Sequence, residues 1–510
     1  MTNKEIIAML QKQHEEDQET IRDLREAVRK LQESIDQLTE NYQTEKRLRK
    51  GIEKISQNKS EKQEPPQMTE EEWKAREAER AAKRKARGNN NAVKSSHLEV
   101  GQPTIKDVYP DDPDFDKNSA IHIGGDTYVR YVLHKARVEK IIYQVHAYKQ
   151  GDVIYKGKAP KGAFRNSEYD GTFVAHIGLL RFIYSMPIER IIKYFEEMGF
   201  HLNKPTAHGL VKKCARALER MGETLKEAVL NDRYINCDET YYRILVPVWN
   251  ETGKHSKKGY IWVLIGVDSG LVYMIYDDGS RSEDIILKEF TDRNRHNVVQ
   301  SDGYTAYKKM ESDENYPQII RLACFQHNKR KFMDCGEDSD AKEIVDFINE
   351  LYHNDHQHRI GEHGWTVDDN LRWRQQYAPP ILKKIRARLD EILSRKDLPP
   401  KSDLAVAANY MNGEWDALCR IFTGGDYALD NNLVERYNRY LSLSRRNSLF
   451  FGSHEGAERG ALLYSFACSC RMNGISFFDY VASVLNELSE IPQNASTSSY
   501  RHLLPDQWKA

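Results

Sequence analysis

The sequence predicts an α/β fold in which a mixed sheet is flanked by helices. Residues 234–246 are rich in aromatic and β-branched side chains, as strands are, and the apolar segments 259–268 and 271–276 continue this pattern across one tight turn. Residues 282–292 show an amphipathic helical pattern, and residues 296–300 are typical of a short buried strand. Three antiparallel strands, a helix and a parallel strand, in that order, predict a ribonuclease H-like core.

The length and charge of the chain limit the functions it can have. Its 510 residues are enough for several domains, one of them with a sizeable hydrophobic core. Charged residues make up 30% of the chain, but the formal net charge is -1, so no global positive field marks a nucleic-acid binder. Contacts with nucleic acid must therefore come from local basic patches.

Cysteine usage and hydropathy indicate a soluble protein of a reducing compartment. Seven cysteines are scattered without CxxC spacing, which argues against a zinc ribbon and against a disulfide framework. Cys468 and Cys470 fit the role of small packing residues. No apolar segment has the form of a signal peptide or the length of a membrane span. We expect a cytoplasmic protein with no membrane partner.

A heptad pattern runs through residues 7–42. β-Branched residues recur at one core position and leucine at the other, which favours a parallel two-stranded coil. The pattern predicts a coiled coil over residues 1–50 that joins chains into a homodimer or higher oligomer; a long helix packed on its own protein is the alternative. The two core positions hold Ile7, His14, Ile21, Val28, Ile35 and Tyr42, and Leu10, Asp17, Leu24, Leu31 and Leu38.

Residues 51–100 are typical of a charged linker, whose basic C-terminal half is the better candidate for phosphate contact. Residues 101–165 form a small mixed segment, with the apolar alternation of short strands at 127–133, 138–147 and 153–155. This segment holds no cluster of ligand residues, and the residues alone assign it no role.

Residues 166–230 are predicted to be helical. A helix, a short turn containing glycine and a helix with a basic face, which includes Lys212 and Lys213, are compatible with a helix-turn-helix that binds DNA. A plain helical bundle is equally compatible with the pattern. The helices are expected over residues 173–184, 188–198 and 207–230.

Two aspartates mark neighbouring strands of the predicted core, residues 231–335. Asp238 lies inside the first strand, and Asp302 follows the fourth. A carboxylate within a sheet is costly to bury unless a cation meets it, and a solvent-facing position would explain Asp238 if it stood alone. In the predicted strand order the first and fourth strands are adjacent, so we expect the two carboxylates to meet. Other acids near this site are second choices: Glu239, Asp268, Asp277 and Asp278.

A third carboxylate is expected from a helix near the end of the chain, and Glu435 supplies it. Asp430 is placed to cap this helix. One face of the helix carries the acid among amides and cations, which is unusual for a merely solvated face; a plain helix with a surface Glu is the alternative. The polar face holds Asn432, Glu435, Asn438, Arg439 and Ser442, and the apolar face holds Val434, Tyr437 and Leu441. Residues 428–488 are assigned to the last core helices and residues 489–510 to a C-terminal tail.

A helical insertion is predicted between the second and third acids. Their separation, 435 − 302 = 133 residues, is longer than a bare ribonuclease H-like core needs. Residues 336–427 have helical patterns over 341–353, 371–394 and 401–421. Their basic residues would either hold DNA or cover solvated helix faces: Arg372, Arg374, Lys383, Lys384, Arg386 and Arg388.

A series of short motifs, taken together, resembles one family. The motifs are Asp238-Glu239-Thr240, Ser301-Asp302-Gly303-Tyr304 with Tyr307, Cys324-Phe325-Gln326-His327 with Arg330-Lys331-Phe332, Asp430-Asn431-Asn432 with Glu435-Arg436, and Arg445-Arg446-Asn447-Ser448-Leu449-Phe450. In this order they are similar to those of the insertion sequence 66 family of bacterial transposases, over about residues 172–488. Any one motif alone is a weak signal, whereas the series is specific.

The resemblance implies a DDE catalytic core with Asp238, Asp302 and Glu435 as metal ligands. Two Mg²⁺ ions, for which Mn²⁺ would substitute, are the implied cofactors, and transposon ends and target DNA are the implied partners, with accessory proteins of the same element. It also implies an N-terminal leucine-zipper-like helix, which the heptads match. Family members commonly carry a Cys-rich zinc module before the core, but residues 101–165 contain no cysteine, so zinc is not expected.

The expected activity is cleavage of the element's ends and joining of the freed 3′-hydroxyl to target DNA in the bacterial cytoplasm, at the nucleoid. Other readings are a catalytically silent DNA-binding relative, a ribonuclease H-like nuclease without strand transfer, and a structural coiled-coil protein. Cations are expected to neutralise DNA phosphates. The DNA-binding candidates are His327, Lys329, Arg330, Lys331, Arg436, Arg439, Arg445, Arg446, Lys212 and Lys213.

Overall fold

The computed structural model describes residues 138–144, 146–150, 153–156, 162–164, 167–247, 254–492 and 494–509. The chain divides into two compact units, Met1–Val129 and Arg130–Ala510, and every described residue lies in the second. The predicted coiled coil, the charged linker and most of residues 101–165 lie outside the described residues.

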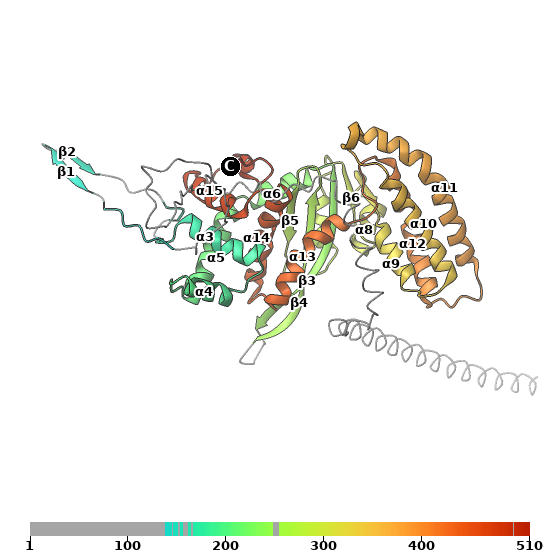
Figure 1. Cartoon of the computed structure of the whole chain (residues 1–510), viewed down its shortest axis with the longest axis horizontal. Helices are drawn as coiled ribbons and strands as arrows, with labels where there is room; N and C mark the ends of the chain where they lie inside the picture. The colour runs from blue at the N-terminus through green and yellow to red at the C-terminus, as the bar shows by residue number, and fades with distance from the viewer. Residues whose placement is uncertain are drawn as a thin grey trace, which may run out of the picture. The chain divides into compact units, whose positions relative to one another are not determined.

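A five-stranded sheet forms the centre of the second unit (Figure 1). The strand order is β5-β4-β3-β6-β7, with β4 antiparallel to both β3 and β5, and with β6 parallel to both β3 and β7. The predicted adjacency of the first and fourth strands is confirmed. The strands are β3 (Tyr234–Pro247), β4 (Lys254–Gly266), β5 (Leu271–Ile275), β6 (Asn297–Gln300) and β7 (Ile319–Leu322).

Burial on both faces explains the long apolar runs of the central strands. Residues 261–265 of β4 are fully buried, and all four residues of β6 are buried. A strand covered on both faces reads as a continuous apolar segment rather than as an alternating one. The helix expected over residues 282–292 is shorter than predicted and consists of α7 (Asp284–Leu287) and η4 (Lys288–Phe290).

Helix α14 (His454–Met472) covers the exposed edge of β5. Ser469 Oγ accepts a hydrogen bond from the backbone N–H of Val272 at 2.8 Å, and Ser465 Oγ accepts one from the N–H of Met274 at 2.9 Å. These serines satisfy backbone donors that an edge strand otherwise leaves unpaired. Cys468 and Cys470 are buried on this helix, as expected for small packing residues.

The helices before the sheet pack together with the last helix of the chain. Helices α3 and α5 both contact α15 (Phe477–Glu490). The helix predicted over residues 207–230 is broken near Met221, where Arg220 donates hydrogen bonds to the backbone carbonyls of Leu488 and Ile491, at 2.8 Å each. The other helices of this group are α3 (Gly171–Gly178), η3 (Leu179–Ile183), α4 (Ile188–Glu197), α5 (Lys204–Glu219) and α6 (Gly222–Leu230).

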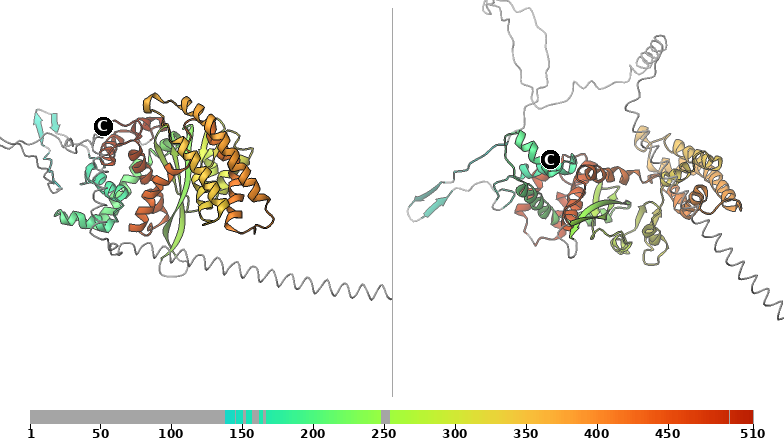
Figure 2. Two further views of the ribbon diagram at one scale, coloured as in Figure 1. Left: turned by 45° about the vertical axis from the view of Figure 1, so that its right-hand side comes forward. Right: turned by 90° about the horizontal axis from the view of Figure 1, so that it is seen from below.

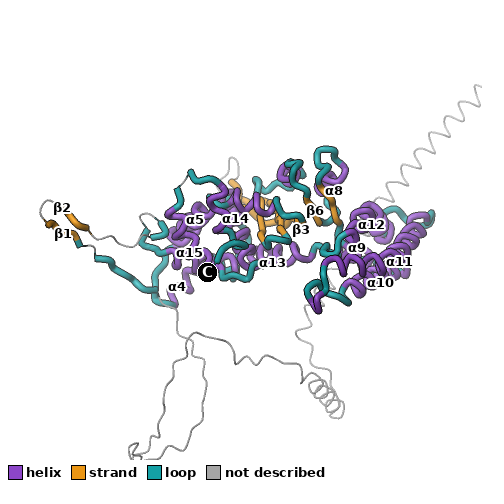
Figure 3. Tube along the Cα trace, turned by 90° about the horizontal axis from the view of Figure 1, so that it is seen from above, coloured by secondary structure: helices purple, strands orange, loops and turns teal. Residues whose placement is uncertain are grey.

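The predicted helical insertion packs at the β7 side of the sheet (Figure 3), and its hydrophobic core includes Tyr234, Val298 and Leu322 of the sheet. Arg321 of β7 forms a buried ion pair with Glu414 of α12, with 2.8 Å between Arg321 Nη1 and Glu414 Oε2. The insertion is therefore fixed to the edge strand by charge as well as by packing. Its elements are α10 (Ser339–Asp355), η5 (Glu362–Gly364), α11 (Val367–Ser394), α12 (Asp403–Arg420) and η6 (Ile421–Thr423).

Both ends of the second unit differ from the sequence prediction. The strand expected over residues 138–147 was wrong for residues 138–144, which are irregular, and the hairpin consists of β1 (Ala147–Gln150) and β2 (Val153–Lys156) (Figure 2). The C-terminal tail is folded: η7 (Thr497–Leu503) contacts α6, and Tyr500 and Leu503 are buried. Among the described residues, no helix is long and apolar enough to cross a membrane.

Candidate active site

Asp238 lies on β3, and Asp302 lies in the loop directly after the adjacent strand β6. The parallel pairing of β3 and β6 runs from Tyr234 opposite Val298 to Asn236 opposite Gln300, an offset of 64 residues. Asp238 and Asp302 have the same offset, since 302 − 238 = 64. Each lies two residues after the last paired residue of its segment, Asn236 or Gln300. The charge of Asp302 raises the pKa of Asp238, as expected for two carboxylates that share a site.

The environment of Asp238 disfavours its negative charge. Burial is the main cause, with the charges of Glu239 and Asp302 next, and together they raise the pKa of Asp238 to about 8. The side-chain amide of Asn438 donates a hydrogen bond to Asp238 Oδ2 at 2.5 Å, which opposes this rise. A buried acid with a strongly raised pKa beside a second acid is a common sign of a functional site.

The loop that carries Asp302 is held by its own backbone and by the helical insertion. The N–H of Tyr304 donates to Asp302 Oδ1 at 3.0 Å, and the N–H of Gly303 donates to the hydroxyl of Tyr410 on α12 at 3.0 Å. A Cβ at Gly303 would come within 2.7 Å of the Tyr410 ring, so only glycine allows this approach. Helix α8 (Thr305–Ser312) starts directly afterwards.

Helix α13 (Asn432–Asn447) begins directly after Asn431, which is hydrogen-bonded to the sheet. Asn431 donates from its side-chain amide to the carbonyl oxygen of Cys237 at 2.8 Å, and Asp430 Oδ1 accepts from the N–H of Asn432 at 3.0 Å. Val434 and Leu441 are fully buried, so the predicted division into an apolar and a polar face is confirmed.

Glu435 lies on the polar face of α13, one turn before Asn438. Its Oε1 is 3.6 Å from Nε2 of His327, which belongs to α9 (Phe325–Met333). The His327 Nδ1 atom is buried and has no hydrogen-bond partner among the described residues. Within that same part of the chain, no three His, Cys, Asp or Glu side chains are grouped closely enough to hold a metal ion. The structure therefore brings Asp238 and Asp302 together and leaves Glu435 paired with His327.

Glu239, a second choice at the sequence level, is a buried acid with a cation of its own. Arg281 Nε donates to Glu239 Oε1 at 3.1 Å, and the Tyr307 hydroxyl donates to Glu239 Oε2 at 3.4 Å. Burial raises the pKa of Glu239, and the hydrogen bond from Arg281 opposes the rise. Alternation along β3 places Glu239 on the opposite face from Asp238. No pattern near Arg281 in the sequence signals this pairing.

The DNA-binding candidates fall into two groups. The first group lies on α13, which carries Glu435, and on α9, which carries its partner His327. Arg330, Arg436, Arg439 and Arg446 are exposed, while Lys331 lies 4.4 Å from the centre of the Tyr410 ring. Lys329 lies 5.9 Å from the centre of the Tyr352 ring. Lys212 and Lys213 are exposed on α5, in the helical group before the sheet.

The basic residues of the insertion are largely paired with acids. Arg374 is buried and donates to Asp355 at 2.8 Å, so its expected surface position was wrong. The remaining pairs are Arg372 with Asp369, Lys384 with Glu350, Arg386 with Asp390, and Arg388 with Asp340, Glu343 and Glu391. Because these cations are already neutralised, they are weak candidates for contact with phosphates.

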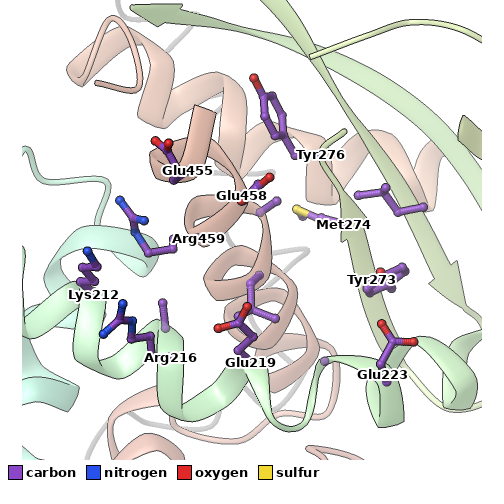
Figure 4. Close-up of a pocket in the computed structure, with 15 residues that line it drawn as sticks. Lys212, Arg216, Glu219, Glu223, Tyr273, Met274, Tyr276, Glu455, Glu458 and Arg459 are labelled. Carbon is purple, nitrogen blue, oxygen red and sulfur yellow. The ribbon is translucent and has the colours of Figure 1, made fainter. Parts of the chain in front are cut away.

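A pocket of about 550 Å³ lies between α5, α6, β5 and α14 (Figure 4). Its charged lining mixes both signs, so it offers no uniform field to an anion or a cation. None of the three candidate acids lines it. The charged residues that line it are Lys212, Arg216, Arg459, Glu219, Glu223, Glu455 and Glu458.

Comparison with known proteins identifies the family. The profile of the family described as "Transposase IS66 family" matches residues 166–459, more than half of the chain. The chain belongs to this family. Every motif that suggested the resemblance lies inside the matched region, including the three candidate acids. Membership of the IS66 transposases implies that the protein binds DNA.

Relatives of this IS66 family member include uncharacterised proteins of Sinorhizobium fredii (strain NBRC 101917 / NGR234). Protein y4jD is 26% identical over 412 residues, which cover 77% of each chain. Protein y4qI is 24% identical over 385 residues, which cover 71% of this chain and 67% of the relative. A solved structure, the Drosophila P element transposase strand transfer complex, matches with a TM-score of 0.31 and 9% identity over 59% of this chain and 93% of that one, a similarity too low to carry an argument.

Proposed function

We propose that this IS66 family member is a DDE transposase that cleaves the ends of its element and joins the 3′-hydroxyl to target DNA. The observation that carries the proposal is the proximity of Asp238, on β3, to Asp302, two residues after the adjacent strand β6, with the same 64-residue offset as the register of these two strands. The strand order, three antiparallel strands followed by two parallel ones, supports a ribonuclease H-like core as the scaffold of this site.

The two aspartates fit a divalent cation. Asp238 is costly to ionise because of its burial and its acidic neighbours, and a bound cation would remove that cost. Carboxylate oxygens are the ligands that Mg²⁺ prefers, with Mn²⁺ as a substitute, whereas zinc favours the sulfur and imidazole ligands that this pair lacks. In two-metal sites the bound ions, about 4 Å apart, activate the attacking oxygen and stabilise the leaving one.

Glu435 is proposed as the third ligand. Asn438, one helical turn further on, already contacts Asp238, so the polar face of α13 is turned toward the aspartate pair. The carboxylate of Glu435 lies 3.6 Å from His327 and retains 29% of its exposed surface, which leaves its side chain room to change rotamer. We propose that the Glu435 carboxylate moves from His327 to the metal site when DNA and metal bind. His327 would then contact a phosphate.

The remaining parts of the proposal concern assembly and location. The exposed cations of α9 and α13 would neutralise the phosphates near the reacting bond. Residues 1–50 would join two or more chains, and accessory proteins of the same element would take part. The reaction would take place at the bacterial nucleoid.

The test is cleavage of the element's own ends by purified protein with Mg²⁺. We expect Asp302→Asn and Glu435→Gln each to lower the cleavage rate by at least about 100-fold, because even residues that only support metal ligands are worth roughly 10–100-fold. Asp277→Asn is the matched control, since Asp277 is exposed and paired with Lys288 at 2.7 Å. Unchanged cleavage by either variant would remove that residue from the site.

The products of the same reaction separate the remaining readings. A transposase yields joined molecules in which an element end is linked to target DNA. Cleavage without joined products would indicate a ribonuclease H-like nuclease, and binding without cleavage by the unmutated protein would indicate a silent DNA-binding relative.

A further inference from the structure

Strands β3 and β4 continue past the rest of the sheet as a two-stranded ribbon. Their antiparallel pairing extends from Thr240 opposite Ile261 to Pro247 opposite Lys254, whereas β5 pairs with β4 only from Trp262 onward. Figure 1 shows this pair reaching beyond the neighbouring strands. We call this extension, residues 240–247 and 254–261, the basic ribbon.

The basic ribbon has one buried face and one open face. Tyr242 and Ile244 are buried, and the Tyr242 ring packs against that of Phe451 with centroids 4.3 Å apart. On the open face, Tyr241 lies opposite Tyr260, and Arg243 lies opposite Lys258. Side chains alternate between the faces of a strand, so these four residues share one surface.

The cations of the open face contact aromatic rings or a hydroxyl rather than acids: Arg243 donates to Ser256 Oγ at 3.4 Å, and the other two lie over tyrosine rings. Lys258 Nζ lies 4.7 Å from the centre of the Tyr241 ring and 5.1 Å from that of Tyr260, and Arg445 Cζ lies 4.0 Å from that of Tyr241. Within the described residues, Arg243, Lys258 and Arg445 form no ion pair with a carboxylate. Residues 240–247 and 254–261 also contain no Asp or Glu. Ring contacts of this kind fix a cation without neutralising it.

On β3 the open face continues to Glu239 rather than to Asp238, and one cation connects it to the loop that carries Asp302. Arg281 Cζ lies 5.1 Å from the centre of the Tyr260 ring and 4.3 Å from that of Tyr304. The N–H of Tyr304 bonds Asp302 at 3.0 Å. Arg281 differs from the ribbon cations because it is paired with Glu239. The uncompensated positive charge is therefore on the ribbon itself.

We propose that the open face of the basic ribbon binds the sugar-phosphate backbone of duplex DNA next to the loop that carries Asp302. This proposal rests on the proposed function, because the proposed function makes the loop of Asp302 part of an active site. Cations at fixed positions that are not neutralised by carboxylates match the phosphates of DNA. Tyr241 acts as a positioning residue, because it holds both Lys258 and Arg445.

The test measures binding without catalysis, by fluorescence anisotropy of a labelled duplex in EDTA over a range of salt concentrations. Each lost phosphate contact lowers the slope of log K against log salt concentration by about 0.9. We expect the double variant Arg243→Gln with Lys258→Gln to lower that slope by about 1.8 and to weaken binding at low salt by roughly tenfold or more. Lys342→Gln is the control, because Lys342 is exposed but already paired with Glu337.

A second pair of variants tests the role of the ring. Tyr241→Leu should weaken duplex binding severalfold although no charge is lost, and Tyr241→Phe should restore it, because the cation contact needs only the aromatic face. Wild-type slope and affinity in the double variant, or equal binding by the Leu and Phe variants, would overturn the inference. Cleavage by Asp302→Asn tests the proposed catalytic role separately, so a failure of that role shows in the cleavage assay and a failure of this inference shows in the binding assay.

Discussion

At the scale of single residues, Asn438 supports the candidate site without belonging to the acid set. Its amide donates to Asp238 Oδ2 at 2.5 Å and so orients a carboxylate whose pKa burial raises. We expect Asn438→Ala to weaken Mn²⁺ binding and to lower DNA cleavage by roughly 10–100-fold, which is typical of residues that orient metal ligands. Calorimetry of Mn²⁺ binding, together with the cleavage assay, measures both effects.

The matched control for this prediction is Asn447→Ala, at the other end of the same helix. Asn447 donates to the carbonyl of Ser185 at 3.1 Å, so its loss tests the general effect of removing an amide from α13. Equal Mn²⁺ affinity in the Asn438 variant and this control would show that the contact with Asp238 plays no part in metal binding.

At the scale of elements, the ion pair between β7 and α12 fixes the helical insertion. Arg321 and Glu414 are 2% and 1% exposed, and Lys308 also lies 2.6 Å from Glu414. We expect Glu414→Gln to lower the local stability of α12 and β7 by about 1.5–3 kcal/mol, because it removes one of the two carboxylates that pair with buried Arg321 and leaves Glu311, at 2.7 Å, as the other. Hydrogen exchange of the amides in these two elements measures the loss.

An exposed pair of the insertion provides the comparison. Glu350 and Lys384 are 41% and 51% exposed and 3.4 Å apart, so Glu350→Gln should cost less than about 1 kcal/mol. Replacing both Arg321 and Glu414 by Met should recover part of the stability lost in the single variant. If the two glutamine variants exchange equally fast, the buried network does not anchor the insertion.

The elements also show which parts of the site a sequence can predict. Asp238 and Asp302 could be paired in advance because strand order follows from local patterns and turns, and the order sets the neighbours. The contact of Glu435 with His327 depends on how α9 and α13 pack, and these helices lie more than a hundred residues apart in the chain. The predicted strand began at residue 259, so residues 254–258 of the basic ribbon were missed, because Lys257 and Lys258 interrupt the alternation that marks a half-buried strand.

At the scale of the whole molecule, the packing of the helices around the sheet also depends on contacts between distant residues, which local sequence patterns do not predict. The break near Met221 has a local signal in Gly222, the first residue of α6, whereas the hydrogen bonds of Arg220 to carbonyls near residue 490 cannot be seen in the sequence. The folded tail was likewise not predicted, since Tyr500 and Leu503 are buried only by contact with distant elements. Patterns that are local in the chain predict elements, whereas contacts between distant elements decide which charges stay free.

The last prediction concerns self-association through residues 1–50, which lie outside the described residues. Their heptads place β-branched residues and leucine at alternating core positions, a pattern that favours a two-stranded parallel coil. We expect deletion of residues 1–50 to lower the mass measured by light scattering to that of a smaller assembly. Polar substitution of Leu24 and Leu31 in the full chain should do the same, because both occupy the predicted seam. Substitution of Glu26 and Arg29 by Gln, outside the seam, should leave the mass unchanged; an unchanged mass after the deletion would place self-association elsewhere in the chain.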